Sequence, residues 1–148
     1  MNVLIADNQG ITRAGLMYIL QSVNEVESRC VADKAGLIEE LKSCPNGVVI
    51  VDYTLFDIND AAELLVLGDR FPTACWLLFS DDLSTDFIRL VLASSTRFGI
   101  VLKDSPLSEI RMAIITALSG QRYICQRVTE LLLRPERKEE IVKLTATE

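Results

Sequence analysis

Five polar residues follow short, apolar, strand-like runs of the sequence, and their types could do chemistry together. Asp7 and Asn8 follow VLIA, Asp52 follows VVIV, Ser80 follows CWLLF and Lys103 follows GIVL. Carboxylate and amide oxygens suit a hard cation such as Mg²⁺, which favours carboxylates, carbonyls and water. Aspartate and serine are also common turn residues, so the combination, and not any one residue, indicates a functional site.

A carboxylate can act as a nucleophile toward phosphorus and form an aspartyl phosphate. The transferred phosphoryl group carries negative charge on three oxygens and needs a cation, an ammonium and a hydroxyl as partners. Lys103 and Ser80 fit the last two roles, and Asp52 is the candidate nucleophile. The chain contains no histidine, which excludes histidine-based triads, general bases and metal ligands.

The elements that would position these residues are short strands that alternate with helical segments. Apolar residues recur at i, i+3, i+4 and i+7 between the strand-like runs, as in the segment from Ile11 to Ile19. This alternation predicts an α/β fold with parallel strands, right-handed crossovers and helices on both faces. We expect all five strands to be apolar throughout, because both of their faces are covered. Residues just past the carboxyl ends of such strands gather at one edge of the sheet. The predicted strands are 3–6, 28–32, 48–51, 75–79 and 99–102.

Composition limits the remaining classes of protein. A chain of 148 residues fits one domain, and its net charge of −6 argues against a surface built for nucleic acid or anionic lipid. No run approaches the ~20 apolar residues of a membrane span, and the start lacks the basic region of a signal peptide. We expect a cytoplasmic protein with no membrane segment. The cysteines form no CxxC pair, which predicts reduced, buried thiols at Cys30, Cys44, Cys75 and Cys125.

Taken in order, the motifs resemble those of receiver domains of bacterial two-component response regulators. They are VLIADN with the acidic position at Asp7, VIVDYTLFD with the phosphoacceptor position at Asp52, LLFSD with the hydroxyl position at Ser80, and GIVLKD with Lys103. The resemblance covers about residues 1–120. It implies a flavodoxin-like, doubly wound fold of five parallel strands in the order 2-1-3-4-5.

The resemblance also implies roles for the site residues. Asp52 would take a phosphoryl group from a phosphohistidine on a sensor histidine kinase. Lys103 would pair with the phosphoryl oxygens, and Ser80 would move to hydrogen-bond them. That movement would reshape the face made by the fourth helix, fifth strand and fifth helix. The chain would be a signalling module and not an enzyme, with at most slow autodephosphorylation. Mg²⁺ would be held by Asp7, Asn8, Asp52 and the main-chain carbonyl of Thr54.

The end of the sequence resembles receivers of the NarL/LuxR type in particular. The similarity lies in KDSPLSEIRMAIITALSGQRYIC, and KLTATE is similar to the first residues of the helix-turn-helix domain that follows such receivers. We therefore expect a receiver over residues 1–121, then a short helix and charged linker over 122–148, leading to a DNA-binding domain absent from this chain. DNA would be bound only through that domain. A homodimer is expected because receivers of this type often pair.

Departures from the family pattern leave a second hypothesis open. Asn8 stands at the second acidic position, which predicts weaker Mg²⁺ binding, and Asp81 stands where small residues are usual and could repel a phosphoryl donor. Ile100 occupies the position of the usual switch aromatic, so no ring can swing inward there. A degenerate receiver that acts as a phosphorylation-independent dimerisation or interaction module is therefore the alternative. A nucleotide-binding enzyme is disfavoured, since ADNQGITRAG has no GxGxxG or Walker pattern.

Overall fold

The computed structural model describes residues 1–23, 25–54, 56–81 and 83–133. Over these residues, strands and helices alternate as the sequence predicted. The strands are β1 (Asn2–Ala6), β2 (Glu27–Cys30), β3 (Val48–Val51), β4 (Cys75–Ser80) and β5 (Phe98–Leu102). The helices are α1 (Gly10–Gln21), α2 (Lys34–Ser43), α3 (Ala61–Arg70), α4 (Thr85–Ser94), α5 (Leu107–Leu118) and α6 (Gln126–Leu133). No helix within the described ranges is long and apolar enough to cross a bilayer.

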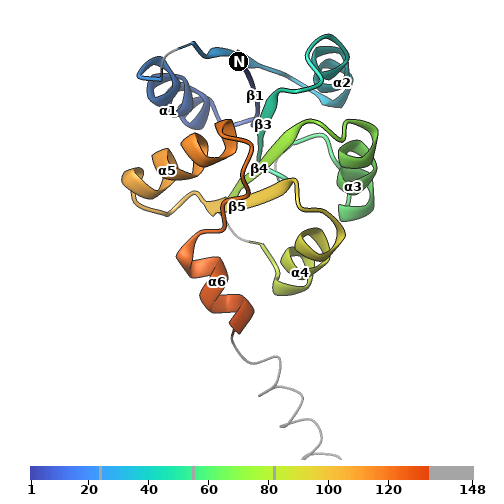
Figure 1. The fold of residues 1–148 in the computed structure, drawn as a ribbon, viewed down its shortest axis with the longest axis vertical. Coiled ribbons are helices and arrows are strands. Elements are labelled where there is room, and N and C mark those ends of the chain that lie inside the picture. Colours follow the sequence, from blue (N-terminus) through green and yellow to red (C-terminus); the bar gives the residue numbers. More distant parts are fainter. Residues whose placement is uncertain (24, 55, 82, 134–148) are drawn as a thin grey trace, which may run out of the picture.

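The strands form one parallel sheet in the order β2-β1-β3-β4-β5. The predicted α/β fold class and strand order are thereby confirmed. Helices α1 and α5 lie on one side of the sheet, and α2, α3 and α4 lie on the other (Figure 1). Because helices α1 to α4 each connect successive parallel strands, the carboxyl ends of all the strands face the same edge.

Strands β3, β4 and β5 are buried on both faces, as their apolar sequences predict. Every residue of β3, β4 and β5 is buried, and the stacked rings of Trp76 and Phe98 lie in the core. The same expectation is wrong for β2, where Glu27, Arg29 and Cys30 are exposed. Strand β2 is at the edge of the sheet and pairs with β1 alone. Strand β5 lies at the opposite edge but stays buried, because residues 123–125 bond to its outer side, whereas the described residues place no strand or bridge on the outer side of β2.

The cysteines are free thiols, but they are not all buried. Cys75 and Cys125 are buried in the core, whereas Cys44 is partly exposed and Cys30 is exposed. The prediction of a buried thiol is therefore wrong for Cys30, because that residue ends the edge strand β2.

Helices α2, α3 and α4 each begin with a side-chain cap, just after the carboxyl end of the preceding strand. The side chains of Asp33, Asp60 and Ser84 accept hydrogen bonds from the amides of Gly36, Glu63 and Phe87, at 2.7, 2.8 and 3.1 Å. Such caps satisfy amides in the first turn that have no partner within the helix. They therefore help to define where α2, α3 and α4 begin.

Residues 121–133, which we call the C-terminal segment, pack against β5. The amide of Ile100 donates to the carbonyl of Tyr123 at 2.7 Å, and the amide of Cys125 donates to the carbonyl of Ile100 at 3.0 Å. A Cβ atom at Gly99 would lie 2.7 Å from the Tyr123 carbonyl oxygen, so only glycine permits this approach. The short helix predicted after residue 121 is present as α6. The predicted linker at 134–148 lies outside the described residues.

Candidate functional site

The ends of four strands bring together the charged and hydroxyl side chains that the sequence singled out. Ala6 pairs with Val51 in the sheet, so the residues that follow them, Asp7 and Asp52, lie side by side. Lys103 reaches across from the end of β5, and its Nζ lies 2.9 Å from Asp7 Oδ2 and 2.6 Å from Asp52 Oδ2. The lysine side chain is 8 % exposed, and both carboxylates are almost fully buried.

The two oxygens of Asp52 have different surroundings. Oδ1 accepts hydrogen bonds from the amide and hydroxyl of Thr54, at 2.9 and 2.7 Å, and from Ser80 Oγ at 2.9 Å. Oδ2 instead faces the ammonium of Lys103. One oxygen is therefore held by neutral donors, while the other lies beside the positive charge.

These contacts change the pKa values of both partners. Burial raises the pKa of Asp52, but Lys103, Thr54 and Ser80 stabilise its ionised form, and the pKa lies below the ordinary value. Burial lowers the pKa of Lys103, but Asp52 and Asp7 outweigh that effect, and this pKa lies above the ordinary value. The site therefore holds an ionised carboxylate beside a protonated lysine at neutral pH.

Gln9 also belongs to the site, and the sequence reading missed it. Lys103 Nζ donates a hydrogen bond to Gln9 Oε1 at 2.6 Å, and the amide of Gln9 donates to Asp7 Oδ1 at 2.8 Å. Thr12 Oγ1 donates to Gln9 Oε1 at 3.1 Å. The ammonium of Lys103 is thus surrounded by three acceptor oxygens. The only signal in the sequence was the place of Gln9, two residues after Asp7.

The carboxylates of Asp7 and Asp52 fit a divalent cation as ligands. The Oδ2 atoms of Asp7 and Asp52 are buried and have no hydrogen-bond partner among the described residues, and each is paired only with the Lys103 charge. Within the described ranges, no group of three or more His, Cys, Asp or Glu residues could hold a metal. Mg²⁺ commonly takes one or two carboxylates and completes its shell with water and phosphate oxygens, and that is what Asp7 and Asp52 can offer.

The remaining predicted residues are not themselves members of the Lys103 ion pairs. Asn8 is exposed next to Asp7, and Asp81 is exposed at the end of β4. Thr54 contacts Asp52 through its amide and hydroxyl. Ile100 is fully buried inside β5, between Leu78 of β4 and the C-terminal segment.

Comparison with known proteins gives the class of the fold. No protein-family model matches the chain. The chain is 23 % identical over 136 residues to the oxygen regulatory protein NreC of Staphylococcus aureus, and the match covers 90 % of this chain and 62 % of NreC. The chain thus spans less than two thirds of the length of the curated relatives it matches.

Solved structures agree with this similarity. The RcsB response regulator of Salmonella typhimurium has a TM-score of 0.77 at 23 % identity, and the match covers 99 % of this chain and 78 % of RcsB. The isolated REC domain of RcsB with the phosphomimetic BeF₃⁻ has a TM-score of 0.76 at 23 % identity, covering 89 % and 98 %. A LuxR-family two-component response regulator from Aurantimonas sp. has a TM-score of 0.75 at 18 % identity, covering 95 % and 97 %.

The chain therefore has the fold of response-regulator receiver domains. At these identities the likeness shows the fold alone, and membership of the NarL/LuxR type stays a prediction from the motifs.

Proposed function

We propose that this chain is the phosphoacceptor domain of a two-component response regulator, and that Asp52 receives a phosphoryl group from the phosphohistidine of a sensor histidine kinase. The observation that carries this proposal is the buried ion-paired cluster in which Lys103 Nζ lies 2.6 Å from Asp52 Oδ2 and 2.9 Å from Asp7 Oδ2. It supplies a nucleophile and a positive charge for the phosphoryl oxygens in one place.

In the proposed reaction, a carboxylate oxygen of Asp52 attacks phosphorus and forms the oxygen–phosphorus bond of an acyl phosphate. The bond from phosphorus to the histidine nitrogen of the donor breaks, and that nitrogen keeps the electron pair. Asp52 is ready to attack because its lowered pKa keeps it ionised. Lys103 pairs with the phosphoryl oxygens, and Ser80 turns its hydroxyl from Asp52 Oδ1 toward them.

Mg²⁺ would be held by Asp7, Asn8, Asp52 and the main-chain carbonyl of Thr54, and when bound it supplies positive charge to the phosphoryl oxygens. Because Asn8 replaces an acid, two carboxylates carry the charge of the site. The chain works as a signalling module, and any loss of the phosphoryl group is a slow self-reaction.

The phosphorylated receiver would act through neighbouring parts of a longer protein. A receiver over residues 1–121, continued by the short helix and charged linker of 122–148, would control transcription through a C-terminal DNA-binding domain. Two receivers would pair as a homodimer, and the protein would work in the cytoplasm. The length of the curated relatives supports such a longer protein, because the chain covers 62 % of NreC.

A degenerate receiver is the second candidate, and one observation favours it. Asp81 places an exposed negative charge at the end of β4, directly after Ser80. A phosphoryl donor approaching the edge would meet that charge. In that case the fold would serve as an interaction module that needs no phosphorylation.

Intact-protein mass spectrometry separates the two candidates. The parent chain, Asp52→Asn and the matched control Asp57→Asn are incubated with Mg²⁺ and excess acetyl phosphate. The proposal predicts a gain of one phosphoryl group in the parent and in Asp57→Asn, and none in Asp52→Asn. Absence of any gain in the parent would favour the degenerate receiver.

A further inference from the structure

Ile100, at the position where receivers usually carry the switch aromatic, is fully buried in this protein. Its amide and carbonyl bond to Tyr123 and Cys125 of the C-terminal segment. Because Gly99 has no Cβ atom, that segment can approach the strand more closely than any other residue would allow. The main chain of Ile100 is thus fixed between β4 and the C-terminal segment, and its buried aliphatic side chain carries no ring that could swing between buried and exposed positions. A signal from Asp52 must therefore leave the site by another route.

One contact does connect the residue after Asp52 to a neighbouring helix. The ring of Tyr53 stacks on the ring of Phe87, with centroids 4.2 Å apart and planes 27° apart. Phe87 is buried in the first turn of α4, where its amide donates to the capping hydroxyl of Ser84. The stack thus joins the end of β3, which carries Asp52, to the start of α4.

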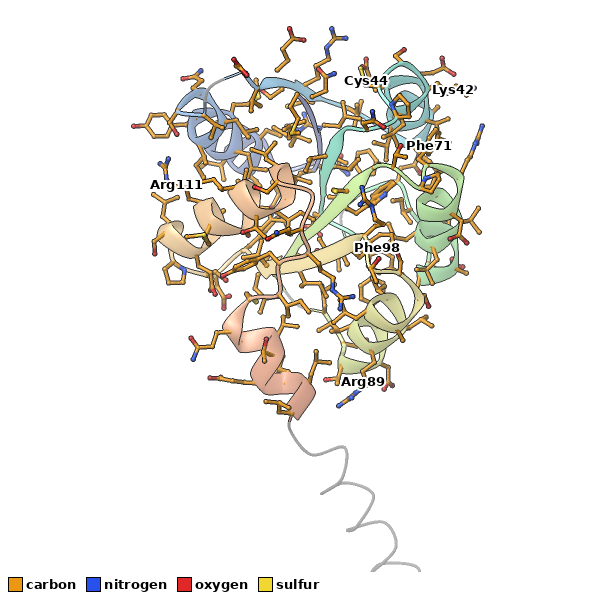
Figure 2. The ribbon with its side chains drawn as sticks, viewed as in Figure 1. Lys42, Cys44, Phe71, Arg89, Phe98 and Arg111 are labelled. Atoms are coloured by element: carbon orange, nitrogen blue, oxygen red, sulfur yellow. The ribbon has the colours of Figure 1, made fainter. Side chains whose placement is uncertain are left out.

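Helix α4 is in turn tied to the C-terminal segment. Arg89 Nη2 donates to the carbonyl of Leu132 at 3.0 Å, and Figure 2 shows Arg89 beside the end of α6. Arg122 Nη1 also reaches the carbonyls of Leu92 and Ser95, both at 3.2 Å.

The other side of the same segment is fixed to α5. Tyr123 Oη donates to Glu109 Oε2 at 3.0 Å, and the amide of Gln126 donates to the same carboxylate at 3.3 Å. The segment therefore bridges α4 and α5. A displacement of α4 relative to α5 has to weaken one of these two sets of bonds.

We infer that the Tyr53–Phe87 stack couples phosphorylation of Asp52 to α4, and that the bonds from α4 to the C-terminal segment pass the displacement on to α6. The inference rests on the proposed function and adds the route by which the site acts. Two nearby events move the ends of this route. When the carboxylate of Asp52 becomes an acyl phosphate, its carbonyl oxygen is a weaker acceptor for the amide and hydroxyl of Thr54, which is next to Tyr53. Ser80 turns at the start of the connection to α4.

Hydrogen–deuterium exchange of the whole 148-residue chain tests this route. Exchange of peptides from residues 121–133 is measured with Mg²⁺ alone and with Mg²⁺ plus beryllium fluoride as the phosphoryl mimic. The variant Tyr53→Leu keeps an apolar side chain but removes the ring. The matched control Tyr18→Leu changes a tyrosine on α1 that is 72 % exposed. Phe87→Leu removes the other ring, so the result does not depend on one variant folding. Fluorine NMR reports bound fluoride in each sample.

In the parent and in Tyr18→Leu, beryllium fluoride is expected to speed exchange in α6 at least about fivefold. In Tyr53→Leu and Phe87→Leu, the mimic is expected to bind while the exchange rate changes less than about twofold. A full response in both ring variants, or no response of α6 in a parent that binds the mimic, would overturn the coupling alone. Failure of the parent to bind the mimic would overturn both the proposed function and the coupling.

Discussion

At the scale of single residues, the site is a buried cluster with unequal charges. Asp7 and Asp52 carry two negative charges, and Lys103 is the one cation that the described residues place within an ion-pair distance of both. One negative charge is left without compensation in a place that water reaches poorly. A divalent cation would reverse that sign and prepare the site for a dianionic phosphoryl group.

Removal of Lys103 should cost more stability than removal of Asp52. Lys103→Met leaves two buried carboxylates facing each other, and we expect a loss of about 3 kcal/mol in the free energy of unfolding. Asp52→Asn leaves one carboxylate paired with one ammonium, so its cost should be smaller than that of Lys103→Met. Urea unfolding measures both, with Lys42→Met on the exposed surface of α2 as the control. Equal costs for Lys103→Met and Lys42→Met would contradict this account of the cluster.

The pKa shifts predict a plateau of stability with pH. Because the folded pKa of Asp52 is lowered, its contribution is present above the unfolded value of about 3.9 and is lost as pH falls through the folded pKa. Because the folded pKa of Lys103 is raised, its contribution is complete below about 10.4 and is lost as pH rises through the folded pKa. The free energy of unfolding, measured with urea at a series of pH values, should fall less steeply toward acid pH in Asp52→Asn than in the parent chain. If the free energy of unfolding falls as steeply toward acid pH in that variant as in the parent, the attribution of this loss to Asp52 is refuted.

At the scale of elements, the strands that the sequence predicted best are those that build the site. The runs around β1, β3, β4 and β5 are apolar because both faces of these strands are covered, and that pattern is visible in one dimension. The polar residues that follow them were therefore predictable as neighbours in space. Strand β2 was predicted less well, since its place at the edge depends on the order of the whole sheet.

Other features could not be predicted because they depend on tertiary contacts. The stack between Tyr53 and Phe87 brings together residues that are far apart in the chain. That Gln9 accepts a hydrogen bond from Lys103 could not be predicted, because it depends on how far apart the two residues lie across the edge of the sheet. The C-terminal segment can pack against β5 because residue 99 is a glycine, and no periodic pattern of the sequence indicates that contact.

Substitution of Gly99 should release the C-terminal segment. The Cβ atom of Gly99→Ala would lie 2.7 Å from the carbonyl oxygen and 3.0 Å from the amide nitrogen of Tyr123. We expect a loss of about 2 kcal/mol and faster hydrogen exchange in α6. The matched control is Gly15→Ala on α1, where a Cβ meets nothing within 4 Å. That control should gain about 0.5 kcal/mol, because alanine favours a helix. Similar unfolding free energies for the two variants would contradict the steric argument.

At the scale of the whole molecule, the domain and its site are thermodynamically linked. The oxygens of Asp7 and Asp52 come together only when β1 and β3 pair, so the unfolded chain has no equivalent cation site. Any ligand that binds only the folded state stabilises the entire domain.

Mg²⁺ should therefore raise the unfolding temperature of the chain. At a concentration a hundredfold above its dissociation constant, one bound ion adds about 2.7 kcal/mol. Scanning calorimetry with Mg²⁺, against NaCl at matched ionic strength, separates binding from screening of the net charge of −6. Asp7→Asn should lose most of the shift. The same shift in NaCl as in Mg²⁺ would mean that the effect is general screening.

The central claim, that Asp52 becomes an acyl phosphate, is tested most directly by chemical trapping. After incubation with Mg²⁺ and acetyl phosphate, borohydride reduces an aspartyl phosphate to homoserine, and tandem mass spectrometry locates it in the tryptic peptide of residues 43–70. That peptide also contains Asp57, Asp60 and Asp69 as internal controls. The account predicts homoserine at position 52 alone. Homoserine at another aspartate, or at none under donor excess, would contradict it.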